Sequence, residues 1–434
     1  MRVADHFTPA ARLQAMLDVE GTLAEAEASL DVIPQSAARA IHDVCRAELY
    51  DAAALTDAAR RAGNLAIPLV RELTQKVAAA DADAARYVHW GTTSQDIIDT
   101  ALVLQLRDSI PTIVADLNRA ADAAAGHARR HANTPMAGRT WLQQATPVTF
   151  GLKAAGYVDA LDRVSCGIGA ALNAAMVLQF GGAAGTLAAL GDRGMPVAKR
   201  LAAALRLQLP SVPWHAHRDR LAALCCALGV AAGAVGKIAR DIALLAQTEV
   251  GEAHEGRSDG GSSTMPQKQN PVNSAAVLAA AVRAPGLVAT ILAAMPQEHE
   301  RALGGWQAEW DTIPELVIAA SDAASAIADV LERLVVNPGR MRANLEASGG
   351  LILAEAVAMQ LAPRLGRNEA HALVERAARR AASERRSFAD VLSEDPRISE
   401  ILDRRAIDEA LKPETYLGST SAFIADVLAR HAKA

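Results

Sequence analysis

Residues 261–271 combine the side chains that a proton-transfer site needs. The stretch reads GSSTMPQKQNP and lies within a sequence otherwise rich in Ala and Leu. Ser262 offers a hydroxyl, Lys268 a cation, and Asn270 an amide that can hold a carboxylate or orient the loop. Pro271 suits the first turn of a helix whose positive end would face the loop. A surface linker is the plain alternative, because loops favour this composition.

A second polar interruption spans residues 87–96 and reads YVHWGTTSQD. It brings His89 and a run of hydroxyls to the start of an expected helix, which Thr93 or Ser94 could cap. An ordinary capped helix start, with His89 as a satisfied polar residue, is the structural alternative.

Two further stretches carry polar groups. The sequence AGRTWLQQATP places Thr140, Trp141 and Gln143 close together. The charged run QEHER ends at Arg301. Such a run usually marks a solvated helix face, although the guanidinium of arginine also suits bidentate binding of a carboxylate.

Signals for disulfide or metal chemistry are weak. The four cysteines include no Cys-x-x-Cys pair, so buried free thiols are expected. His215 and His217 lie two residues apart, but no Cys, His or carboxylate cluster accompanies them in the sequence. A metal site is therefore not expected.

The composition favours a helical protein. The chain has 434 residues, about half of them hydrophobic, with few aromatic residues. Abundant Ala and Leu favour closely packed helices over a β-rich fold. The net charge of -5 argues against a nucleic-acid partner, which would want a basic surface. An anionic small-molecule substrate remains compatible with this charge, because a local site can still be basic.

Hydrophobic periodicity indicates several long helices. Apolar residues recur at alternating spacings of three and four over 221–245, which is typical of a helix-bundle seam. Helices are also expected over 9–30, 97–130 and 272–295.

The sequence also bears on the cellular location. The N-terminus lacks the apolar core of a signal peptide. The most apolar segment lies between Arg220 and Lys237, and it is shorter than the roughly 18 residues of a membrane span. We therefore expect a soluble cytoplasmic protein that has no membrane partner.

Three of these stretches resemble, in the right order, the signature regions of the fumarase/aspartase superfamily. The family patterns are His-x-Gly-x-Thr-Ser-x-Asp, Gly-Arg-Thr-His-Leu-Gln-x-Ala and Gly-Ser-Ser-x-Met-Pro-x-Lys-x-Asn-Pro, and the last matches at every fixed position. The resemblance implies an all-α fold with a central bundle of long helices. The three helical domains are expected over 1–96, 97–348 and 349–434, with the signature loop at 258–271.

The resemblance also implies a homotetramer in which each active site collects residues from three subunits. Ser262 matches the catalytic serine that acts on a carbon-bound proton. A serine hydroxyl is too weak a base alone, so a cationic environment must activate it. Catalytic roles are expected for Ser262, Lys268 and His89. Contacts with the substrate are expected for Thr93, Ser94, Thr140, Trp141, Gln143, Asn270 and Arg301.

Trp141 departs from the family pattern, because it stands where the lyases carry histidine. That histidine assists an amine leaving group, which needs a proton, whereas a carboxylate leaving group needs none. Together with Trp214-His215 and the run HERALGGW at 299–306, Trp141 resembles the superfamily's lactonising cycloisomerases. That resemblance implies a tricarboxylate diene as substrate and no cofactor or metal. An adenylosuccinate-lyase-like C–N lyase and a non-catalytic helical scaffold are the alternatives. The retained Ser262, Lys268 and Asn270 argue against the scaffold.

Overall fold

The computed structural model of the chain describes residues 2–256, 265 and 268–433. Contacts divide the chain into two compact units. The first comprises Met1–Asp116, Val164–Gly233 and Ala279–Ala324. The second comprises Leu117–Arg163, Ala234–Leu278 and Ser325–Ala434. The division into three domains that the resemblance implies stays a prediction.

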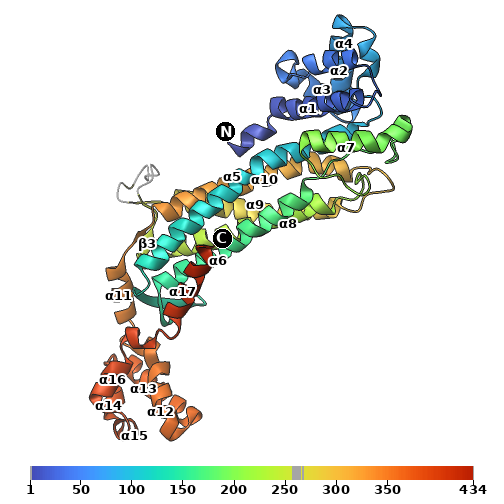
Figure 1. The fold of residues 1–434 in the computed structure, drawn as a ribbon. Helices are drawn as coiled ribbons and strands as arrows, with labels where there is room; N and C mark the ends of the chain where they lie inside the picture. The colour runs from blue at the N-terminus through green and yellow to red at the C-terminus, as the bar shows by residue number, and fades with distance from the viewer. Residues whose placement is uncertain (1, 257–264, 266–267, 434) are drawn as a thin grey trace. The chain divides into compact units, whose positions relative to one another are not determined.

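Long helices dominate the described residues, and each contributes one part to each unit (Figure 1). Their bounds are α5 Ser94–Arg130, α6 Phe150–Ala175, α8 Asp219–Leu245, α9 Val272–Ala294 and α10 Gly305–Glu332. Within the second unit, the Tyr157 hydroxyl of α6 donates to Asp241 of α8 at 2.8 Å. The helices that periodicity predicted over 97–130, 221–245 and 272–295 are confirmed within three residues at each end.

The apolar spacing of α8 explains its burial. Leucines three and four residues apart lie on one face of a helix. Leu221, Leu224 and Leu228 are each at most 2% exposed. Val235, Ile238 and Ile242 continue the same stripe and are each 1% exposed. The predicted bundle seam is therefore a buried surface.

Two of the long helices contradict the expectation that no segment reaches the length of a membrane span. α8 and α9 are long and apolar enough to cross a membrane, judged by length and composition, and the bent pair α11–α12 would pass if it were one span. In α8, 56% of the most apolar window is buried within the chain, whereas in α9 only 22% is buried. Exposed apolar surface of this kind is typical of sites that contact another protein or a membrane.

The N-terminal helices of the first unit form the helical cluster drawn in blue (Figure 1). Thr8 caps the first of them, since its hydroxyl accepts from Ala11 N at 3.2 Å, and Pro9 occupies the first turn. α7 also packs against α1. The bounds are η1 Val3–Phe7, α1 Pro9–Ala28, α2 Gln35–Asp43, η2 Ala47–Leu49, α3 Ala52–Ala62, α4 Ala66–Ala80, η3 Ala84–Tyr87, η4 Ala188–Arg193 and α7 Gly194–Leu205.

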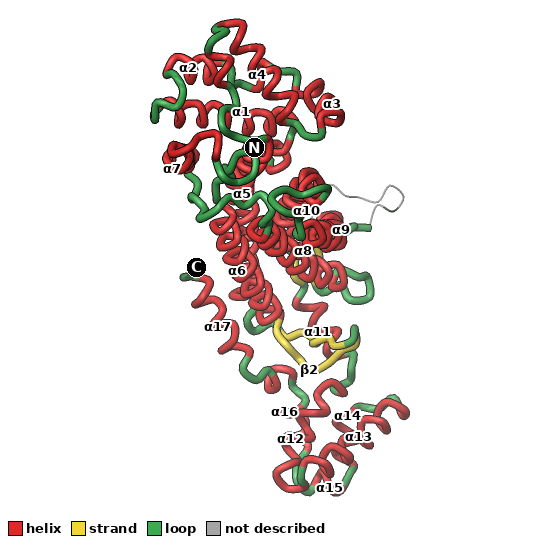
Figure 2. Tube along the Cα trace, turned by 90° about the vertical axis from the view of Figure 1, so that its right-hand side faces the viewer, coloured by secondary structure: helices red, strands yellow, loops and turns green. Residues whose placement is uncertain are grey.

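Short helices near the C-terminus surround a small apolar core within the second unit (Figure 2). Phe388, Leu361 and Ile398 are completely buried there. The bounds are α11 Pro338–Glu346, η5 Leu351–Leu353, α12 Ala354–Leu365, α13 Arg367–Glu384, α14 Phe388–Glu394, α15 Pro396–Ser399, α16 Arg404–Ala410, η6 Pro413–Tyr416 and α17 Thr420–His431. Ile424 of α17 packs separately, against Ala128 and Ala154.

Two small antiparallel sheets interrupt the helices, and the sequence did not predict them. β1 (Pro135–Thr140) pairs with β2 (Gln143–Thr149), and β3 (Ala253–His254) pairs with β4 (Val335–Val336). α11 packs against β1, and the strands appear in yellow in Figure 2. The β1–β2 hairpin carries three of the predicted site residues.

Candidate functional site

In the first unit, the structure brings Thr93 and Arg301 together. Thr93 immediately precedes α5, and Ser94 is the first residue of that helix. The Thr93 hydroxyl does not cap the helix; it accepts a hydrogen bond from Nη1 of Arg301 at 3.0 Å. The two residues are 208 positions apart in the sequence, so tertiary folding alone creates this contact.

The guanidinium of Arg301 is held by neutral oxygens. Its Nη2 donates to the carbonyls of Ala183 at 2.9 Å and Gly182 at 3.4 Å. Its Nε is buried and has no hydrogen-bond partner among the described residues. Among those residues, no carboxylate forms an ion pair with it. The residue as a whole is half-buried. A partly buried cation without a counter-ion is a suitable partner for a carboxylate ligand.

His89 occupies a strained position next to a buried carboxylate. Its φ of 61° lies in the left-handed region, which is uncommon outside glycine. Its Nδ1 lies 2.6 Å from Oε1 of Glu20, whose side chain is 1% exposed. Burial alone lowers the pKa of His89, but the charge and hydrogen bond of Glu20, with a smaller effect of Asp96, outweigh burial and raise it. Glu20 is a site neighbour that the sequence did not reveal.

A buried ion cluster joins three helices beneath these loops. Arg218, which immediately precedes α8, binds Asp99 of α5 at 2.6 Å and Glu309 of α10 at 2.5 Å. All three side chains are at most 2% exposed. Trp306 also donates from Nε1 to Asp99 at 3.0 Å. Because removing one partner of such a cluster leaves an uncompensated buried charge, the cluster fixes where these helices lie relative to one another.

In the second unit, Thr140 and Gln143 face each other at the end of the β1–β2 hairpin. The two residues between them, Trp141 and Leu142, have φ values of 51° and 64°. Positive φ at both central positions is the pattern of a type I′ hairpin turn, where glycine, asparagine or aspartate is the usual residue. Trp141 is 96% exposed and Leu142 is 79% exposed. The chain therefore presents a bulky aromatic side chain at a strained tip.

Arg139 anchors this hairpin to a buried carboxylate. Its guanidinium binds Glu252 through two hydrogen bonds of 2.7 and 2.8 Å, and the Glu252 side chain is 0% exposed. Asn344 donates to the same carboxylate at 2.8 Å. Gly138 is required because a Cβ there would lie 2.5 Å from the carbonyl oxygen of Thr146.

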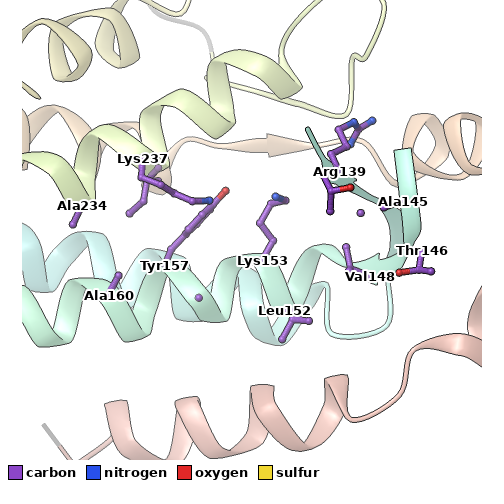
Figure 3. A pocket seen from close by; sticks show the side chains of 14 residues that line it. Arg139, Ala145, Thr146, Val148, Leu152, Lys153, Tyr157, Ala160, Ala234 and Lys237 are labelled. Carbon is purple, nitrogen blue, oxygen red and sulfur yellow. The ribbon is translucent and has the colours of Figure 1, made fainter. Parts of the chain in front are cut away.

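A cavity of about 580 Å³ lies beside Thr140, between the hairpin, α6 and α8 (Figure 3). Figure 3 shows Lys153 and Tyr157 rising from α6 towards the side of the cavity where Arg139 and Lys237 lie. Apolar residues such as Val148, Leu152, Ala160 and Ala234 complete the wall.

The cations of this cavity already have partners. Lys153 lies 3.7 Å from Asp241, and Lys237 pairs with the same carboxylate. Burial lowers the pKa of Lys153, and the charge of Asp241 partly opposes that effect. Arg139 is neutralised by Glu252. The cavity is thus a weaker candidate for binding a free carboxylate than Arg301, which lacks such a partner.

The signature stretch is only partly described. Ser262 lies outside the described residues. The Lys268 side chain is exposed and Asn270 is half-buried. Glu255 accepts from the backbone N–H groups of Asn273 and Ser274 at 3.2 and 2.7 Å. It therefore occupies donors of α9 that we expected to point at the signature loop.

The predicted site residues thus fall into two groups. The first unit holds His89, Thr93, Ser94 and Arg301. The second unit holds Thr140, Trp141, Gln143, Lys268 and Asn270. The functions of all these residues stay predictions.

His215 and His217, which lie two residues apart, have different surroundings. His215 is buried and its Nε2 lies 2.7 Å from Asp96, whereas His217 is exposed. Within the described residues, no group of three or more His, Cys, Asp or Glu side chains is arranged to hold a metal ion. All four cysteines are free, but Cys166 is exposed, so the expectation of buried thiols is wrong there.

Comparison with known proteins places the chain in a family. Residues 2–286 match the family described as Lyase, and residues 350–427 match the family described as the adenylosuccinate lyase C-terminus. The chain belongs to this lyase family, within the fumarase/aspartase superfamily, and the fold that the signature regions implied is confirmed.

Individual relatives cover nearly the whole chain. The 3-carboxy-cis,cis-muconate cycloisomerase of Pseudomonas aeruginosa is 53% identical over 98% of this chain and 93% of its own length. The enzyme of the same name from Bradyrhizobium diazoefficiens is 52% identical over 95% and 92%. A crystal structure of the 3-carboxy-cis,cis-muconate lactonizing enzyme from Pseudomonas putida matches with a TM-score of 0.94, at 48% identity, covering 99% of this chain and 97% of that one.

Proposed function

We propose that this protein is a 3-carboxy-cis,cis-muconate cycloisomerase. It closes the tricarboxylate diene to 4-carboxymuconolactone in the β-ketoadipate pathway of protocatechuate breakdown. The observation that carries the proposal is Trp141, an aromatic residue at the position where amine-releasing lyases of the superfamily carry histidine. Two relatives that are more than half identical bear the name of this activity.

The chemistry of lactonisation fits the loss of that histidine. An oxygen of the substrate's own carboxylate forms the new C–O bond to a diene carbon, and a proton is added to the carbon next to another carboxylate. In the reverse direction the C–O bond breaks and the leaving group is a carboxylate. It needs no proton from the protein, since its conjugate acid is already strong. Trp141 would instead shape the pocket around a flat diene and exclude water.

The proton transfer at carbon is assigned to Ser262, with Lys268 as the cation that lowers the cost of charge on the serine oxygen. His89, paired with Glu20, is the third residue with a proposed catalytic role. Loss of the carbon-bound proton places a second negative charge on the adjoining carboxylate, so the site requires cationic and hydrogen-bonding groups.

Substrate carboxylates are assigned to the predicted binding residues. Arg301 is the strongest candidate, because it carries donor capacity that no carboxylate of the described chain uses. Ser94, Thr140, Gln143 and Asn270 are the other proposed contacts. Thr93 would serve both Arg301 and the substrate through its hydroxyl.

A homotetramer in which subunits share active sites completes the proposal. The exposed apolar surface of α9 and the exposed Trp141 both require cover, and other copies of the chain would supply it. We accordingly propose a soluble cytoplasmic enzyme in place of a membrane protein. Sedimentation of the purified protein is the test, and a stable, active monomer would contradict this arrangement.

The alternative function is a C–N lyase resembling adenylosuccinate lyase, which the family match at residues 350–427 favours. Product analysis separates the two. Incubation with 3-carboxy-cis,cis-muconate should give 4-carboxymuconolactone in the proton NMR spectrum. Unchanged carboxymuconate, together with fumarate formed from adenylosuccinate, would support the lyase.

A further inference from the structure

Asp96 lies in the first turn of α5 and is 1% exposed. Its Oδ2 accepts from the backbone N–H of Thr93 at 3.1 Å and from the hydroxyl of Thr92 at 3.2 Å. The Thr93 hydroxyl of the same turn accepts from Arg301. The carboxylate of Asp96 thus fixes the turn on which the Thr93–Arg301 contact depends.

The same carboxylate also holds the glycine turn that Arg301 contacts. The backbone N–H groups of Gly181 and Gly182 donate to it at 2.9 and 2.8 Å. Gly182 has a φ of 70°, and a Cβ there would lie 3.0 Å from the carbonyl oxygen of Gly91. Only residues without side chains allow the two turns to approach this closely.

His215 completes the arrangement. Its Nε2 donates to Oδ1 of Asp96 at 2.7 Å, and both side chains are buried. A Cβ on Gly181 would lie 2.8 Å from Cε1 of the His215 ring, so the ring fills the space beside the glycine turn. The histidine therefore restricts the carboxylate of Asp96 to one orientation.

Arg301 contacts the same two segments that Asp96 joins. It binds the Thr93 hydroxyl on one segment and the carbonyls of Gly182 and Ala183 on the other. We propose that Asp96 and His215 are positioning residues that hold the Arg301 guanidinium in the orientation in which it binds a substrate carboxylate. The inference rests on the proposed function, in which Arg301 contacts the substrate.

Affinity for a stable tricarboxylate provides the test. Tricarballylate binding is measured by calorimetry, beside kcat and KM for carboxymuconate. Asp96→Asn replaces one acceptor oxygen by a donor and leaves a buried N–H unpaired, so binding should weaken roughly tenfold to a hundredfold. The loss should appear mainly in KM. His215→Leu should have a similar effect and provides a second variant if Asp96→Asn does not fold.

Two histidine variants act as controls. His215→Gln keeps an N–H donor for Asp96 and should recover most of the affinity that His215→Leu loses. His217→Leu changes an exposed histidine in the same loop and should bind like the wild type. Equal losses in the two His215 variants would contradict a positioning role.

A double-mutant cycle decides whether the pair acts through Arg301. In an Arg301→Met background, adding Asp96→Asn should weaken binding less than about threefold. Independent, multiplicative losses would overturn the inference. If tricarballylate binding shows this coupling but the wild type does not convert carboxymuconate, only the proposed function is overturned. If the wild type neither binds tricarballylate nor converts carboxymuconate, both the inference and the proposed function are overturned.

Discussion

Nη1 of Arg301 donates to the hydroxyl of Thr93 at 3.0 Å, while Nε of the same guanidinium is buried without a partner among the described residues. A buried N–H group without an acceptor is unfavourable unless a ligand supplies one. The arrangement suits a site that is finished by a substrate carboxylate.

Replacement of Arg301 should therefore damage substrate binding. A charge-assisted hydrogen bond contributes about 1.5–3 kcal/mol, so Arg301→Met should lower kcat/KM by roughly 10- to 100-fold. Arg301→Lys should recover only part of the loss, since lysine lacks the planar fork. Arg39→Met, which changes an exposed arginine of α2, is the matched control. A wild-type KM in Arg301→Met would remove the residue from the binding site.

Replacement of Ser262 should abolish turnover and leave binding intact. The hydroxyl of Ser262 is the proposed acid and base at carbon, and such a group contributes about 10²-fold or more. Ser262→Ala should lower kcat by at least that factor, while tricarballylate affinity and the circular dichroism spectrum stay near those of the wild type. The neighbouring Ser263→Ala serves as the control. Near-normal rates in Ser262→Ala would exclude it from the mechanism.

The turn between β1 and β2 offers a matched pair of variants. A residue with a side chain at positive φ costs roughly 1 kcal/mol of conformational energy, which glycine avoids. Trp141→Gly and Leu142→Gly should therefore both keep the hairpin. Only Trp141→Gly should lose most lactonising activity, because it alone removes the aromatic wall. Equal activity in the two variants would contradict a pocket role for Trp141.

Trp141→His tests whether the identity of residue 141 alone decides between lactonisation and adenylosuccinate cleavage. The smaller ring should loosen the pocket and reduce lactonisation moderately. It should not create adenylosuccinate cleavage, because the pocket for a nucleotide would still be missing. Rapid cleavage of adenylosuccinate by Trp141→His would mean that the remaining pocket already fits that substrate.

The long helices could be predicted from the sequence, but the hairpin could not. The hydrophobic periodicity over 221–245 predicts that one face of a helix is buried, and in the structure that face is buried. The β1–β2 hairpin lacks this signal: its strands are short, a register shift falls between Ala137 and Gly138, and Trp141 and Leu142 occupy turn positions normally reserved for small residues. The local sequence therefore gave no reason to expect a turn there.

The pairing of site residues was also beyond sequence reasoning. Glu20 is 69 positions from His89, and His215 is 119 positions from Asp96. No spacing rule connects residues so far apart. Asp96 did have one signal, because it is a fixed position in the family pattern that contains His89, although that pattern does not say what its carboxylate binds.

The pKa of Glu27 is a measurable consequence of its burial next to Glu20, the carboxylate that contacts His89. Burial, followed by the charge of Glu20, raises it to about 9 from an ordinary value of 4.5, and the side chain is 1% exposed. The folded chain therefore keeps a proton that the unfolded chain releases above pH 4.5. Stability should fall as the pH rises towards 9, by at most about 1.4 kcal/mol per pH unit from this group.

Glu27→Gln should remove that contribution. Thermal unfolding at a fixed protein concentration should show the variant gaining stability relative to the wild type between pH 5 and pH 8. Glu48→Gln, which changes an exposed glutamate paired with Arg46, should show no such trend. An equal difference between Glu27→Gln and the wild type at both pH values would contradict a raised pKa.

The identity of the substrate is tested most directly by one comparison of rates. The wild-type kcat/KM is measured by absorbance for 3-carboxy-cis,cis-muconate and for adenylosuccinate, with argininosuccinate as a third substrate. We expect rapid consumption of carboxymuconate, with kcat/KM at least about 10³-fold above either alternative, since a site without the buried contacts for a nucleotide or an amino acid discriminates strongly. Efficient cleavage of adenylosuccinate by an enzyme that ignores carboxymuconate would contradict it.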